Sequence, residues 1–171
     1  MQGNPSHPSM PRQRAFTLLE LLVVIAVIGV LAALALPRFM AIADDAQEAA
    51  VQATAGALSA GVIMVRGQWE LNRARGQSSG SGPVTGFGTG NVIASATGWP
   101  LGTHNTGNAE ACTEIWKNVM QGTIPSVATT GATADYLAIY VDMQCRYRYQ
   151  RSGRHEIRYD TASGAVEVRA D

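Results

Sequence analysis

The pattern of apolar and polar positions predicts a membrane-spanning helix near the N-terminus. Residues 21–36 are all apolar or glycine. With the five residues before them they form a segment that, as a helix, spans about 31 Å at 1.5 Å per residue. This length matches the hydrocarbon core of a bilayer. We therefore predict a spanning helix from Phe16 to Leu36.

The helical pattern continues beyond Pro37, which follows the apolar run directly. Proline lacks the N–H that a helix interior needs, so we expect a kink or local melting at this residue. We predict one helix from about Phe16 to Arg73, about 85 Å long, with a stripe of small alanines that packs on a sheet. Two helices broken at Pro37 are the alternative. The apolar positions close to a period of 3.6 are Phe39, Ile42, Ala46, Ala49, Ala50, Ala53, Ala57, Ala60, Val65 and Trp69.

The remaining sequence predicts a small mixed domain. Residues 76–107 are rich in turn-forming residues, with Trp99-Pro100 as a local anchor. A short helix is expected from its cap at Asn108 to a stop at Gly122, with Trp116 in the core. Period-two patterns then predict an antiparallel meander of three or four strands. The expected strands are 136–141, 143–150, 155–159 and 166–169, and the first two could instead form one long bent strand.

The two cysteines, Cys112 and Cys145, predict one disulfide. Two buried free thiols would be the better interpretation for a cytosolic protein. The predicted membrane segment favours export, and disulfides persist in oxidising compartments. Arg12 and Arg14 precede the apolar run, so the positive-inside rule places that end in the cytoplasm and the C-terminal domain outside.

Glu20 distinguishes the possible types of N-terminal segment. An ordinary signal anchor, or a secretory signal cut after Ala33-Leu34-Ala35, has no use for a carboxylate in this run. Inserting it costs about 2 to 3 kcal/mol. Alternatively, the Glu20 side chain simply extends from the end of the helix into the lipid headgroup region. An ionisable residue in a spanning run is otherwise a candidate functional residue.

The segment Ala15-Phe16-Thr17-Leu18-Leu19-Glu20 with its following apolar run resembles the class III prepilin signal of type IV pilins and type II secretion pseudopilins. The resemblance covers about 25 residues, and it implies the ladle-shaped α+β fold of that family. It further implies that prepilin peptidase cuts between Ala15 and Phe16 and methylates the Phe16 amine. Ala15 departs from the glycine usual before the cut. The Cys-x-Tyr-x-Tyr and Ala-Cys-x-x-Ile-Trp stretches resemble mannose-sensitive haemagglutinin (MSHA)-type pilins, a weaker match.

The resemblance implies the following organisation and partners. Residues 1–15 are a removed leader, whose start is Met1 or Met10; residues 16–36 are the membrane and assembly half of the helix, 37–75 its amphipathic half and 76–171 the globular head. Glu20 would pair with the Phe16 amine, either within one subunit or with that of a neighbouring copy in a filament, because an unpaired buried charge is costly. Expected partners are further copies, minor pilins, prepilin peptidase, an inner-membrane assembly platform and membrane lipid. The precursor would lie in the inner membrane.

Other kinds of site have little support in the sequence. Lys and Arg number 13 and Asp and Glu number 13, so net charge gives no general case for a polyanionic partner. Nucleic-acid binding by arginines 146, 148, 151, 154 and 158 is not favoured, because Glu156 and Asp160 are expected to pair with them across the sheet. His104 and His155 lack catalytic or metal-binding companions, and Asp44 and Asp45 point about 100° apart on a helix. We expect no cofactor, no metal and no catalysis.

Three functions remain open from the sequence. The first is a subunit of a type IV pilus that serves adhesion or surface attachment. The second is a pseudopilin of a type II secretion system; the disulfide and the absence of an obvious acidic calcium loop near the C-terminus favour the pilus. The third is a membrane-anchored enzyme or a secreted binding protein, cut after Ala35.

Overall fold

The computed structural model describes residues 16–78, 80–104, 107–131 and 133–170, in two compact units that divide between Ala43 and Asp44. The leader expected at residues 1–15, with Ala15, lies outside the described residues. The long helix α1 (Leu18–Ala74) contributes to both units. Every other helix and strand of the described chain belongs to the second unit.

Helix α1 passes through Pro37 without a break. The alternative of two separate helices is therefore wrong, and the helix shows no local melting at this residue. Proline removes a single backbone donor, while the neighbouring alanines and leucines are strong helix formers. A kink at Pro37 stays a prediction.

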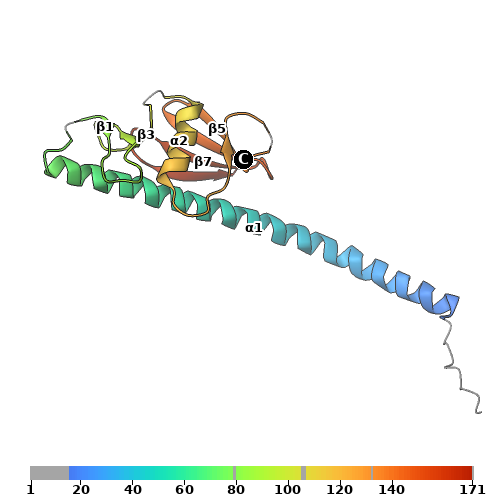
Figure 1. Cartoon of the computed structure of the whole chain (residues 1–171). Helices are drawn as coiled ribbons and strands as arrows, with labels where there is room; N and C mark the ends of the chain where they lie inside the picture. The colour runs from blue at the N-terminus through green and yellow to red at the C-terminus, as the bar shows by residue number, and fades with distance from the viewer. Residues whose placement is uncertain (1–15, 79, 105–106, 132, 171) are drawn as a thin grey trace, which may run out of the picture. The chain divides into compact units, whose positions relative to one another are not determined.

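The main sheet has five strands in the order β4-β5-β6-β7-β8, coloured orange to red in Figure 1. Strand β4 pairs with β5 in parallel and all other pairs are antiparallel. The four-stranded antiparallel meander predicted from the sequence is thus present, extended by the short β4. The bounds are β4 (Val127–Ala128), β5 (Tyr136–Val141), β6 (Gln144–Tyr149), β7 (His155–Asp160) and β8 (Val166–Ala170).

A tight turn at Asp142 and Met143 separates β5 from β6, so the alternative of one long bent strand is wrong. Both residues have positive φ, 51° and 58°, which is the backbone that a two-residue hairpin turn requires. The Thr161 hydroxyl donates to the Met143 carbonyl at 2.7 Å and holds the turn. Asp142 is of a residue type that tolerates positive φ, but the sequence lacks the Asn-Gly or Asp-Gly pair that clearly marks a two-residue hairpin turn.

Three short strands occupy a segment that the sequence predicted to be turns. They are β1 (Gly82–Pro83), β2 (Ile93–Ala94) and β3 (Pro100–Gly102), and they form a separate antiparallel sheet. Strands of two or three residues are too short to show a period of two. Arg66 of α1 lies over the Trp99 ring, 4.7 Å from its centroid, and Asn72 Nδ2 donates to the Thr85 carbonyl at 2.8 Å.

Helix α2 (Ala109–Val119) begins as the sequence predicted. The Asn108 side chain accepts the Ala111 N–H at 2.8 Å and caps the first turn. The helix ends at Val119, before the expected stop at Gly122. Trp116 is fully buried, as predicted, with its ring against those of Tyr136 and Tyr147.

The face of α1 that packs in the second unit is not the predicted stripe of alanines. The head covers Val51, Ala55, Leu58 and Val62 instead, together with Asn72 and with Val65 and Trp69, the two members of the predicted apolar set that are buried. The alanines at 46, 49, 50, 53, 57 and 60 are exposed. Branched and aromatic side chains bury more apolar area than alanine, so the larger set decides which face the head covers.

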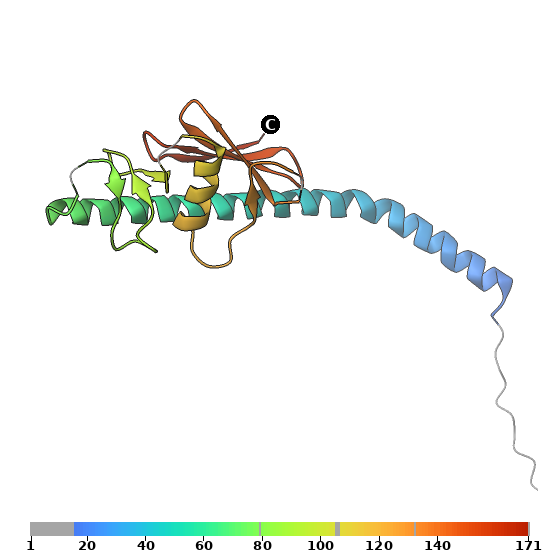
Figure 2. The same cartoon turned by 45° about the horizontal axis from the view of Figure 1, so that its top comes forward.

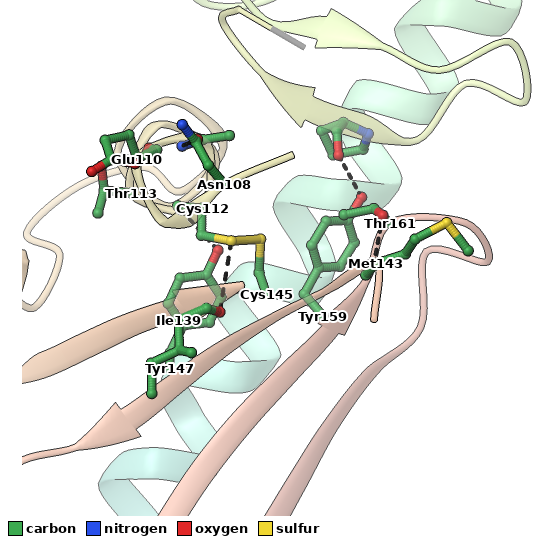
Figure 3. Close-up of a disulfide and its surroundings, with 12 residues drawn as sticks. Asn108, Glu110, Cys112, Thr113, Ile139, Met143, Cys145, Tyr147, Tyr159 and Thr161 are labelled. Carbon is green, nitrogen blue, oxygen red and sulfur yellow. Dashed lines mark hydrogen bonds between the residues drawn. A yellow bond between two sulfur atoms is a disulfide. The ribbon is translucent and has the colours of Figure 1, made fainter. Parts of the chain in front are cut away.

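A disulfide joins Cys112 of α2 to Cys145 of β6, the pairing expected from the sequence (Figure 3). Beside it, the Tyr147 hydroxyl donates to the Cys112 carbonyl at 2.9 Å. The Tyr159 hydroxyl donates to the Pro100 carbonyl at 2.9 Å and links the two sheets. Figure 2 shows α2 and the main sheet beside the same stretch of α1.

These two tyrosines predict alkaline unfolding of the head. Burial raises the pKa of both Tyr147 and Tyr159. The folded state thus holds these protons more tightly than the unfolded state, so the stabilisation is present below pH about 10 and is lost above it. With rising pH we expect tyrosinate absorbance to increase as the circular dichroism signal is lost. Both changes should be less steep in Tyr159→Phe. Ionisation of all five tyrosines near pH 10 without unfolding would contradict this prediction.

Candidate functional site

Thr17 caps the N-terminus of α1. Its hydroxyl accepts the backbone N–H of Glu20 at 3.2 Å, and its carbonyl accepts the N–H of Leu21 at 3.2 Å. A Thr with Glu three residues later is the sequence signature of a capping box. The sequence prediction did not include this cap, although Thr17 and Glu20 have the required spacing of three residues. Helix α1 therefore starts one residue after the cap, and Phe16 precedes it.

Glu20 lies in the first turn of α1 and is exposed. Its carboxylate has no donor among the residues that the structure describes. A negative charge in the first turn is favourable to the helix dipole. Phe16 is four residues earlier, about one helical turn, so the structure keeps the two predicted assembly residues at the same end of the helix.

The apolar run after Glu20 is exposed in the part of the chain that the structure describes. Residues 16–34 and 36–43 are exposed, and only Ala35 is half-buried. The most apolar 18-residue window of the helix has a mean hydropathy of 2.9 and none of it is buried. By length and composition this helix can cross a membrane. The exposed apolar surface of this run is extensive, and such a surface is typical of a segment that contacts lipid or other apolar helices.

The other candidate residues form no catalytic or metal site in the described part of the chain. His104 Nδ1 lies 2.8 Å from Glu114 Oε1, at an exposed loop. His155 meets the Ser152 hydroxyl at 3.1 Å. No group of three or more His, Cys, Asp or Glu side chains is arranged to hold a metal ion within the described ranges.

Asp44 and Asp45 line a hollow of about 420 Å³ together with Glu48, Arg151 and Arg154. Arg154 lies 3.9 Å from Asp44 across it. Carboxylates and guanidinium groups face each other there, so the hollow has no single sign of charge to recruit an ion. It contributes nothing to the site at the helix start.

Glu156 pairs with one of the expected arginines, but the partner is Arg158 of its own strand and not an arginine across the sheet. Glu156 Oε1 accepts from Arg158 Nε at 2.6 Å, within its own strand. Asp160 accepts the N–H groups of Ala162 and Ser163 at 2.8 and 3.0 Å. These hydrogen bonds lower the pKa of Asp160. Residues close in the chain thus engage both carboxylates, and Asp160 also forms a side-chain hydrogen bond with Gln144 of the facing strand β6.

The fold and the uncovered helix define an α+β subunit of type IV pilin-like architecture, with a membrane-capable N-terminal helix. Residues 10–36 match the family model of the prokaryotic N-terminal methylation motif. The chain therefore carries the signature of type IV pilins and pseudopilins, whose members are structural subunits. Comparison with curated proteins and with solved structures gives no match.

Proposed function

We propose that the chain is the structural subunit of a type IV pilus-like filament that serves adhesion or surface attachment. One observation carries the proposal: the apolar first part of α1, which is exposed over residues 18–34 in the described chain, has a single carboxylate in its first turn. In the precursor, lipid would surround the helix. In the filament, helices of other copies would replace the lipid, with minor pilins and an inner-membrane platform as partners.

Processing at Ala15–Phe16 would give Glu20 its role. Cleavage by prepilin peptidase, with the leader in the cytoplasm and the head in the periplasm, leaves a cationic, methylated amine on Phe16. The Glu20 carboxylate accepts no hydrogen bond from the described residues, so it is available to pair with a cation of another chain. Pairing with the amine of a neighbouring copy would satisfy both groups, whereas one left alone in an apolar core costs about 3 to 5 kcal/mol. The pair would thus select the correct register.

A second uncovered face on α1 supports assembly through helix packing. Ala53, Gly56, Ala60, Ile63 and Gly67 are all exposed and follow each other at spacings of three and four residues. This is the repeat of helices that pack side by side, and small residues let the backbones approach closely. Ile63 is 61% exposed, although it is large and apolar.

The glycines of α1 give an independent indication that another helix packs on this face. A Cβ on Gly61 would clash with the Val119 carbonyl oxygen, so α2 explains this glycine. Gly56 and Gly67 have nothing within 4 Å of the same position. Each glycine costs the helix about 0.5 to 1 kcal/mol relative to alanine. Nothing in the subunit explains that cost at Gly56 and Gly67, whereas close approach of another helix would.

We therefore predict opposite effects for two matched substitutions. Gly56→Ala should stabilise the subunit by about 0.5 to 1 kcal/mol, because the added methyl group meets open space. Gly61→Ala should destabilise it by about 1 to 3 kcal/mol through overpacking against Val119. Filament yield should nevertheless fall in Gly56→Leu, whose side chain blocks the face. Normal yield from Gly56→Leu would remove this face from the proposed packing.

The disulfide supports a pilus subunit over a type II secretion pseudopilin, because a bridged head suits long exposure outside the cell. Two measurements test the proposal. Intact mass and N-terminal sequencing of the mature protein should give a methylated Phe16. Electron microscopy of sheared cells, with and without the gene product, should show extracellular fibres that contain it. A chain that begins at Leu36 would overturn the proposal in favour of secretion, and fibres confined to the periplasm would favour the pseudopilin.

A further inference from the structure

The turn between β5 and β6 presents apolar side chains to solvent at one end of the main sheet. Val141 is 38% exposed and Met143 is 60% exposed. Among the described residues outside α1, these are the only large apolar side chains that are exposed. The Met143 carbonyl accepts the backbone N–H and the hydroxyl of Thr161, at 3.1 and 2.7 Å, so the turn is fixed in place. Figure 3 shows the Met143 side chain extending away from the disulfide. We call Val141, Asp142 and Met143 the hairpin tip.

A groove of about 420 Å³ lies at the opposite end of β5. Its walls come from α1, from the segment between α2 and β4, and from the ends of β5 and β6. Ile124, Pro125, Tyr136 and Tyr149 give it a largely apolar lining. Trp116 Nε1 donates to the Pro125 carbonyl at 2.8 Å and ties the loop wall to α2. The groove is therefore formed within the single subunit, as binding sites usually are.

The groove and the hairpin tip carry complementary charges. Asp135 accepts the N–H and the hydroxyl of Ser126, at 3.0 and 2.7 Å, whereas Arg151 of the groove reaches Asp135 only at 3.5 Å. This is the single ion pair of Arg151 within the described ranges, and its side chain is 72% exposed. Such a pair contributes little and exchanges readily. Asp142 of the tip is exposed and has no hydrogen bond or ion pair to any described residue. The tip thus presents an acidic group, and the groove a weakly held basic one.

The tip and the groove lie at different levels along α1. Tyr136, at the start of β5, lines the groove together with Thr54 of α1. At the other end of the sheet, the turn that begins at Thr161 lies against Trp99, whose ring is covered by Arg66 of α1. Strand β5 therefore runs from the groove toward the C-terminal part of α1, over about 17 Å at 3.4 Å per residue. One copy cannot bring its own tip to its own groove.

We propose that the hairpin tip of one copy docks in the groove of a second copy that is displaced along α1. The inference rests on the proposed filament, in which the α1 helices of the copies pack side by side. Tip and groove are different surfaces, so the contact is heterologous and repeats without closing, as an open helical polymer requires. Met143 and Val141 contact the apolar lining, where the flexible methionine fills an irregular space. Asp142 pairs with Arg151 of the second copy.

The first test places cysteines at two exposed positions of the full chain, Met143→Cys in the tip and Thr123→Cys in the groove. Within one copy the two positions are separated by the length of β5, beyond the Cα separation of about 7 Å that a disulfide can span. Sheared fibres, mildly oxidised, should give a ladder of linked subunits on a non-reducing gel. Either substitution alone should give monomers. The control pairs Met143→Cys with Arg169→Cys, an exposed position on the far edge strand β8, and should also give monomers.

Charge reversal provides a second, independent measurement. Asp142→Arg and Arg151→Asp should each lower the fibre yield per folded subunit about tenfold, because like charges then meet at the contact. The double variant should recover most of the wild-type yield, since the two charges again attract. Arg169→Glu reverses a charge outside the contact and should keep the wild-type yield. Circular dichroism of each variant in detergent reports the amount of folded subunit.

The outcomes separate the docking from the filament itself. Fibres that give no ladder, or that give an equal ladder with the control pair, would overturn the docking and leave the filament intact. A charge-reversed double variant that assembles as poorly as the single variants would also overturn the docking. Absence of fibres from the wild-type chain would instead remove the proposed filament, and the docking with it.

Discussion

Glu20→Val is expected to insert into the membrane and to be cleaved normally, yet to assemble about 100- to 4,000-fold less well than the wild type. The cap of α1 uses the backbone N–H of residue 20, so the substitution leaves the start of the helix intact. What is lost is the partner of the Phe16 amine in the proposed filament. An unpaired buried charge costs about 3 to 5 kcal/mol, and every 1.4 kcal/mol is a tenfold change in an equilibrium constant.

The measurement is the amount of subunit in sheared fibres relative to the processed subunit in the membrane. Glu20→Gln separates charge from shape, because it keeps the size of the side chain and should fail almost as severely. Glu20→Asp should retain part of the yield. Glu110→Gln removes an equally exposed carboxylate from α2 and serves as the control. Wild-type yield from Glu20→Gln would show that the carboxylate does not neutralise the amine.

Removing the disulfide should have the second largest effect. The bond closes a loop between positions 33 residues apart in the chain, and both half-cystines are almost fully buried. The chain-entropy relation gives about 4 kcal/mol of stabilisation for a loop of this size. We expect Cys112→Ala with Cys145→Ala to lower the free energy of unfolding of the head by this amount.

Denaturant unfolding of the full chain in detergent, with and without reductant, measures the effect. Reductant should lower the midpoint of the wild type and leave the double variant unchanged, which makes the double variant its own control. An unchanged wild-type midpoint in reductant would mean that core packing alone stabilises the head. A large loss of stability would also reduce filament yield, so folded subunit has to be quantified first.

The sequence predicted those elements whose information is local. The meander from Tyr136 to Ala170 shows a period of two, and Asn108 marks the start of α2. The turn at Asp142 and Met143 was less visible, because aspartate tolerates positive φ but methionine seldom adopts it. The short strands β1, β2 and β3 were missed because two or three residues show no period.

The sequence could not predict which residues contact each other across the fold. The predicted alanines at 46, 49, 50, 53, 57 and 60 and the buried set from Val51 to Trp69 both fit a helical period, and the head packs on the second. Likewise Glu156 could reach Arg148 across the ladder or Arg158 along its own strand, and it pairs with Arg158.

The sequence by itself determined the membrane-length helix, the acidic residue at its start and the methylation motif, because each is set by residues adjacent in the chain. Only the tertiary structure decided which face of α1 the head covers and which arginine pairs with Glu156. Both outcomes result from competition among groups far apart in the sequence, where packing volume and distance, rather than pattern, decide which contacts form.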